Sequence, residues 1–169
     1  LLALGGNSGN PIFDWFIGRE LNPRIGEFDI KTFNELRPGL ILWALLDISC
    51  VCHQYTKFGW VSDSIVLVTL FHLWYIVDSL INESTILTQM DITTDGFGFM
   101  LSVGDLAWLP FTYCLQARFL AFHPIHLGWL GVLAILAVQF TGYYIFRVAN
   151  LEKNEFRHGR NPKGTYIMR

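Results

Sequence analysis

Charged residues are scarce in this chain. Only 15% of its 169 residues are Asp, Glu, Lys or Arg, whereas 52% are hydrophobic. The mean hydropathy is +0.37. These values exclude an ordinary soluble domain, in which about a quarter of the residues are charged, and they indicate an integral membrane protein. The formal net charge of −2 gives no support for nucleic-acid binding.

Cysteine is also scarce, and the motifs of several common sites are missing. Cys50, Cys52 and Cys114 lack the spacing of a metal site, so we predict buried free thiols and no metal. No GxGxxG sequence follows a predicted strand, which leaves a Rossmann domain unsupported. There is no initial methionine or signal peptide, and the sequence ends in a basic polar run, so we expect a fragment of a longer protein.

Long apolar segments dominate what is present. A stretch of about 20 apolar residues is long enough to cross a bilayer as a helix, and Trp and Tyr near several segment ends fit interfacial belts. We therefore predict an all-α, polytopic transmembrane helical bundle with about four spans. The four segments are residues 38–53, 61–82, 97–122 and 125–149.

The distribution of positive charge predicts the orientation. With four spans, ten of the twelve Lys and Arg residues lie on the side that holds both ends of the chain. Only Lys57 and Arg118 lie on the other side, so we expect both ends to face the cytosol. The predicted organisation is a loop at the cytosolic edge (1–37), the spans (38–149) and a basic cytosolic tail (150–169).

Ionisable residues inside the second span are candidates for function, because each is costly in a membrane. His72 lies in this span, and Tyr75, Asp78 and Asn82 share one helix face at i, i+3 and i+7. A phenol beside a carboxylate can act as an oriented proton donor. The alternative is a hydrogen-bonded cluster that holds helices together.

Asp105 is the candidate of the third segment. It follows Gly104 and precedes Pro110, which suggests an unwound stretch that lines a cavity. The alternative is a structural kink with a satisfied carboxylate.

The basic residues after the last segment form a third candidate site. Lys153 and Arg157 lie four residues apart, and on a continuing helix both would project from one face. A point charge and a forked donor suit phosphate groups. The alternative is ordinary positive charge flanking a span.

The stretch from Gly9 to Arg24, GNPIFDWFIGRELNPR, resembles a signature of the membrane-bound sterol reductases. The matching residues are Gly9, Ile12, Asp14, Phe16, Gly18, Leu21, Asn22, Pro23 and Arg24, and Phe13 stands where the family has Tyr or His. The resemblance continues through ELRPGL, YIVDSLINES, DGFGFMLSVGDLAWLPFTYCLQARFL, HPIHL and GYYIFRVANLEKNEFR. It covers essentially the whole chain and is greatest for the branch of delta-14 sterol reductases and the C-terminal domain of lamin B receptor.

The resemblance implies NADPH-dependent reduction of a sterol ring double bond in the endoplasmic reticulum membrane, which is continuous with the inner nuclear membrane. It implies that Tyr75 is a proton-donor element and that Lys153 and Arg157 contact NADPH, whereas Asp78 and Asp105 are acidic candidates from their positions in the sequence. It also implies that this chain is an internal part of a larger protein of roughly ten spans, whose C-terminal helices complete the site. A sterol substrate and membrane lipid are the expected partners.

Other functions remain open at this point. The similar delta-7 reductases act on a different double bond of the sterol. A structural protein of the nuclear envelope, like lamin B receptor, would carry a basic N-terminal arm that binds chromatin. A transporter using the break at Gly104–Asp105 would show inverted repeats in the complete gene, and none is visible in this sequence. For the signature stretch itself, we expect a rigid loop that braces the helices rather than one that contacts a ligand.

Overall fold

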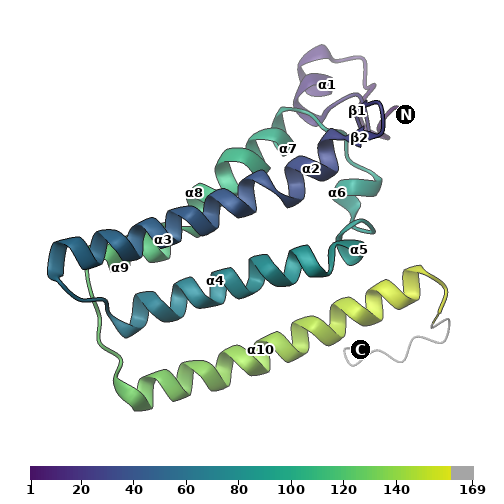
Figure 1. The fold of residues 1–169 in the computed structure, drawn as a ribbon. Helices are drawn as coiled ribbons and strands as arrows, with labels where there is room; N and C mark the ends of the chain where they lie inside the picture. Colours follow the sequence, from purple (N-terminus) through teal and green to yellow (C-terminus); the bar gives the residue numbers. More distant parts are fainter. Residues whose placement is uncertain (161–169) are drawn as a thin grey trace. The chain divides into compact units, whose positions relative to one another are not determined.

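The fold is known from a computed structural model, which describes residues 1–160. The chain forms two compact units, Leu1–Ile125 and His126–Arg169. Helices make up most of both units (Figure 1), which confirms the all-α class.

The first unit begins with short elements at one end of its long helices. Asn10 caps α1 (Pro11–Ile17), and Gly18 ends it. A two-stranded antiparallel ribbon, β1 (Arg24–Ile25) and β2 (Phe28–Asp29), leads into α2 (Ile30–Leu36). The predicted loop over residues 1–37 is therefore wrong in part, because Asn10 and Asp29 supply N-caps that start helices within it.

Two long helices form the centre of the first unit. These are α3 (Pro38–Phe58) and α4 (Asp63–Ile81). The first apolar segment was predicted to end at residue 53, but α3 continues to Phe58 and ends at the left-handed Gly59. The helix continues because Gln54 is buried rather than solvated: its Nε2 donates to the Leu120 carbonyl (2.7 Å), and its Oε1 accepts from Ser62 N–H (2.7 Å).

After α4, two short helices, α5 (Glu83–Ile86) and α6 (Met90–Thr93), form a connection. The chain then returns along α3 as a broken helix, which consists of α7 (Phe99–Val103), the π-helix η1 (Gly104–Trp108), α8 (Leu109–Tyr113) and α9 (Leu115–Phe122). Both α8 and α9 pack on α3, and α9 also packs on α4. The core lies where these helices meet and contains Leu40, Trp43, Ile76 and Cys114.

In the second unit, the described residues 126–160 contain one long helix, α10 (Gly128–Arg157). Within residues 1–160, three helical stretches are long and apolar enough to cross a membrane: Ile30–Phe58, Asp63–Ile81 and Gly128–Arg157. The third predicted segment, residues 97–122, forms the broken helix instead of one uninterrupted helix. The chain is thus a multi-pass helical membrane protein.

Candidate functional site

A buried tryptophan organises the polar aromatic residues of the first unit. Trp43 on α3 is only 3% exposed, and its ring contacts three rings from neighbouring helices. Centroid distances are 4.7 Å to His72 and 5.9 Å to Tyr75, both on α4, and 4.9 Å to Tyr113 on α8. The sequence-predicted Tyr75 is therefore packed on one side, while 45% of its surface stays exposed.

A carboxylate and an imidazole form a pair beside this ring. Asp47 on α3 is completely buried, and its Oδ2 lies 2.7 Å from His72 Nδ1. Sequence reasoning noted His72 but missed Asp47. The available signal was a carboxylate inside an apolar run, which is rare without a partner or a function.

Asp78 lies one turn beyond Tyr75 on α4 and is joined to Asn82. Asn82 Nδ2 donates to the backbone carbonyl of Asp78 (2.9 Å) and to its Oδ1 (3.2 Å). These bonds help to end α4, where Asn82 is the C-cap. The structure thus joins two members of the predicted helix face directly.

Asp105 lies in η1, which contributes no ring to the cluster formed by Trp43, His72, Tyr75 and Tyr113 (the Trp43 cluster). The expected unwinding is wrong, because the backbone widens to a π-helix and stays helical from Phe99 to Tyr113. The residue's carbonyl lies against Gly39 of α3, where an added Cβ would overlap the Asp105 oxygen. π-helical turns are frequent at functional sites, and Asp105 Oδ2 is buried without a hydrogen-bond partner in the described part of the chain.

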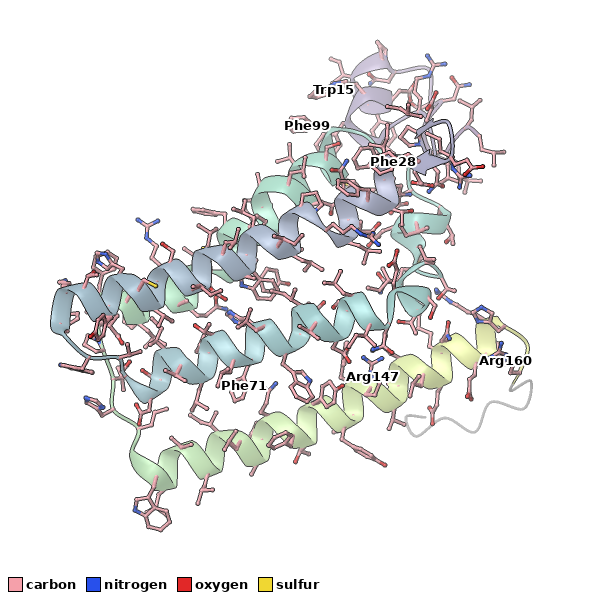
Figure 2. All side chains as sticks on the ribbon, viewed as in Figure 1. Trp15, Phe28, Phe71, Phe99, Arg147 and Arg160 are labelled. Carbon is pink, nitrogen blue, oxygen red and sulfur yellow. The ribbon has the colours of Figure 1, made fainter. Side chains whose placement is uncertain are left out.

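The signature stretch packs against the segment that precedes α7. Trp15 stacks on Phe99 with ring centroids 4.6 Å apart, and Figure 2 shows these two side chains facing each other. An open cavity of about 740 Å³ lies here, and its lining includes Trp15, Arg19, Phe99 and Ser102. Backbone bonds from Ala3 N–H to the Arg19 carbonyl and from Phe97 N–H to the Glu20 carbonyl (both 2.9 Å) tie the stretch in place.

Two aspartates of this region, Asp14 and Asp29, already have structural partners. Asp14 Oδ1 accepts from the Ser8 backbone N–H (2.8 Å) and from the Ser8 hydroxyl (2.7 Å), and these bonds lower the pKa of Asp14. Burial acts to raise the pKa of Asp29, but bonds from Thr32 and Arg24 outweigh it and the net pKa is lowered. Arg24 pairs with Asp29 across the ribbon at 3.2 Å. The contacts support a bracing role for this stretch.

Two further cationic contacts hold the same end of the first unit together. Lys31 is completely buried, and its Nζ donates to the carbonyls of Ile92 (3.2 Å) and Asp95 (2.6 Å). Arg37 pairs with Glu83 at 2.9 Å. Both contacts join α2 or its C-cap to the connection that follows α4.

Lys153 and Arg157 lie on the last turns of α10, which remains helical through Arg157. Both side chains are exposed, and neither forms an ion pair with another residue in the range 1–160. Four-residue spacing places them on one helix face, and a C-terminal position also complements the helix dipole. Lys163 of the predicted basic tail lies outside the described residues.

Among the described residues, no group of three or more His, Cys, Asp or Glu side chains could hold a metal ion. The remaining candidates are the Trp43 cluster with Asp47, His72 and Tyr75, then Asp105 of η1, and the two cations of α10. An acid next to an apolar surface can protonate a bound molecule, and a cationic pair can hold an anion.

Comparison with known proteins gives these residues a context. The model of the "Ergosterol biosynthesis ERG4/ERG24 family" matches residues 1–169. The chain is 67% identical over 96% of its length to Delta(14)-sterol reductase erg24 of Schizosaccharomyces pombe and 59% identical over 95% to ERG24 of Saccharomyces cerevisiae. It is 60% identical over 93% to the Delta(14)-sterol reductase of Ascobolus immersus. The chain covers 39%, 36% and 37% of these relatives, respectively, so it spans less than two fifths of their length.

Proposed function

The chain belongs to the ergosterol biosynthesis ERG4/ERG24 family, and we propose on that premise that the protein containing it reduces the C14=C15 double bond of sterol intermediates with NADPH. The observation that carries the proposal is 67% identity over 96% of the chain to a protein named a delta(14)-sterol reductase. The membrane of the endoplasmic reticulum is the proposed location, and a sterol within that lipid is the proposed substrate.

The chemistry of an isolated alkene sets what the protein must supply. An unactivated double bond accepts hydride poorly, so a proton must arrive first or together with the hydride. Protonation at C15 places the positive charge on C14, where the cation is tertiary and therefore more stable. The protein thus needs a proton donor next to a dry sterol pocket.

Tyr75 is the proposed donor. Its ring is held against Trp43 (5.9 Å between centroids), while 45% of the residue remains exposed. Asp78, one turn away on the same helix, is the proposed neighbour that helps to orient it. Asp105 remains the alternative acid of this chain, since Asp105 Oδ2 has no hydrogen-bond partner among the residues described.

Lys153 and Arg157 are the proposed ligands of the cofactor's phosphate groups. Their exposed side chains combine a point charge with a planar fork, and this donor set fits a phosphate. When bound, NADPH supplies the hydride that C14 accepts. The two cations would fix the position of the cofactor, which matters because hydride transfer depends on orientation.

Expression of the complete gene in a yeast strain that lacks C14 reductase tests the function. We expect sterols that retain the C14=C15 bond to disappear from the strain, as measured by gas chromatography with mass spectrometry. A strain that keeps these sterols but loses a C7 double bond would assign the delta-7 reaction instead.

Alanine at Lys153 or Arg157 should weaken NADPH binding by roughly ten- to a hundred-fold, because each substitution removes one charge-assisted contact. The measurement is the NADPH concentration for half-maximal turnover, with sterol binding unchanged. Arg160→Ala is the matched control, since it removes the same charge just beyond the end of α10. Unchanged NADPH dependence in both variants would leave these residues only a role in setting membrane orientation.

The charge distribution also predicts the membrane topology. In a variant without Cys50, Cys52 and Cys114, a single cysteine at Glu27 or His158 should react with an impermeant reagent only from the cytosolic side. A cysteine at the exposed Thr56, near the end of α3, should react only from the lumen. Labelling of the Glu27 or His158 position from the lumen alone would refute the topology.

A further inference from the structure

The Asp47–His72 pair lies next to the proposed proton donor. Asp47 is 0% exposed, and its Oδ2 lies 2.7 Å from His72 Nδ1. Its other oxygen, Oδ1, has no hydrogen-bond partner among residues 1–160. A buried carboxylate is costly in a membrane-spanning helix, so the stability of the fold alone gives little reason to place an aspartate here.

The geometry of the pair determines which histidine nitrogen can exchange a proton. A carboxylate oxygen accepts hydrogen bonds, so Nδ1 of His72 carries the hydrogen directed at Asp47. The other ring nitrogen, Nε2, is then left for proton exchange. In metal sites, the same carboxylate–histidine arrangement fixes both the tautomer and the ring orientation.

His72 and Tyr75 lie one turn apart on the same face of α4 and share a contact. Trp43 of α3 packs against both rings, with centroids at 4.7 Å from His72 and 5.9 Å from Tyr75. Side chains at i and i+3 of a helix are neighbours, with Cβ atoms about 5–6 Å apart. Among the titratable or charged residues of the elements packed around His72, Asp47 of α3 contacts its ring directly. The others are Cys50, Cys52, His53, Tyr55 and Lys57 on α3, Asp63, Tyr75 and Asp78 on α4, Tyr113 on α8, Cys114 between α8 and α9, and Arg118 on α9.

We propose that His72, held by Asp47, is a positioning residue that returns a proton to Tyr75 after each turnover. The inference rests on the proposed function. When the Tyr75 hydroxyl gives its proton to C15 of the sterol, a phenolate remains. The proton on Nε2 of the protonated His72 passes to this oxygen and leaves a neutral imidazole, with Nδ1–H still bonded to Asp47. Solvent then restores the proton on Nε2, so the cycle is balanced.

His72→Gln and Asp47→Asn in the full-length protein test the relay. Glutamine retains an N–H donor for Asp47 but cannot carry a proton, and asparagine retains the shape of the carboxylate without its charge. We expect turnover to fall roughly ten- to a hundred-fold in each variant, which is the effect that loss of the carboxylate partner has on histidines in metal sites. The KM for sterol and for NADPH should stay unchanged.

The pH profile separates a relay from a structural role. The relay needs the protonated imidazole ring of His72. Turnover of the wild-type protein should therefore fall as the pH rises, and His72→Gln should lose that dependence. His53→Gln is the matched control: His53 is an exposed histidine on α3 that contacts Phe122, and its replacement should leave the profile intact.

Two results would overturn the relay. One is a His72→Gln protein that keeps the wild-type pH profile. The other is a loss of turnover fully explained by less folded protein and a lower Tm. Either result in a protein whose wild type reduces the C14=C15 bond refutes the relay alone. A wild type that does not reduce this bond refutes the proposed function instead.

Discussion

Replacing Tyr75 with phenylalanine should lower turnover by roughly 10²–10⁴-fold, the usual contribution of a positioned acid. The substitution removes only the hydroxyl. The ring that packs on Trp43, with 5.9 Å between centroids, stays in place. Folding and NADPH binding should therefore be preserved, so the loss should appear in kcat rather than in the amount of protein.

Tyr113→Phe is the matched control for this result. Tyr113 also packs on Trp43 (4.9 Å between centroids) and is 49% exposed, so the same atom is lost from a similar environment on α8. Its replacement should leave turnover close to wild type. Equal activity in the Tyr75 variant and the wild type would remove this hydroxyl as the donor and direct attention to Asp105. A collapse in expression would instead indicate that Tyr75 belongs to a structural cluster.

The long helices could be predicted because apolar length is a local property of the sequence. The segments at residues 61–82 and 125–149 correspond to α4 and to most of α10. The end of α3 was missed because it depends on a distant partner. Gln54 is polar, and only its bonds to Leu120 and Ser62 explain why the helix continues past residue 53.

The candidate site was less predictable, since its contacts join different helices. Spacing along α4 predicted that Tyr75, Asp78 and Asn82 share one face. It could not predict that Asp47 of α3 contacts His72, because that contact joins two helices. Gly104 and Pro110 around Asp105 suggested an interrupted helix, whereas the backbone stays helical there and forms a π-helical turn. This difference weakens the transporter hypothesis, which relied on an unwound segment lining a cavity.

The signature stretch shows how a motif can be recognised in the sequence while its physical role remains hidden. The sequence predicted a rigid loop that braces the helices, and the structure adds that Asn10 caps α1 through its side-chain oxygen. The reason for Gly18 could not be read from the stretch. It depends on Gly96 and Gly98, almost eighty residues later, whose backbone lies directly against Gly18.

Gly18→Ala should be the most destabilising single substitution in this stretch. The residue has a φ of +98°, and a side chain in such a conformation costs about 1–3 kcal/mol. An added Cβ would also overlap the Gly98 nitrogen. Backbone atoms cannot move aside as a flexible side chain can, so overpacking should add about 1–3 kcal/mol. We expect a marked fall in Tm and in the amount of monodisperse protein in detergent.

Gly9→Ala separates the two contributions to this loss. Gly9 has a similar φ of +86°, but an added Cβ there would have nothing within 4 Å. Its replacement should therefore show the backbone strain alone, about 1–3 kcal/mol, and a smaller fall in Tm. Equal falls in the two variants would mean that contact with Gly98 contributes nothing. A larger fall for Gly18→Ala would show that the signature stretch is held by direct backbone packing against the segment that leads into α7, as the expected bracing role requires.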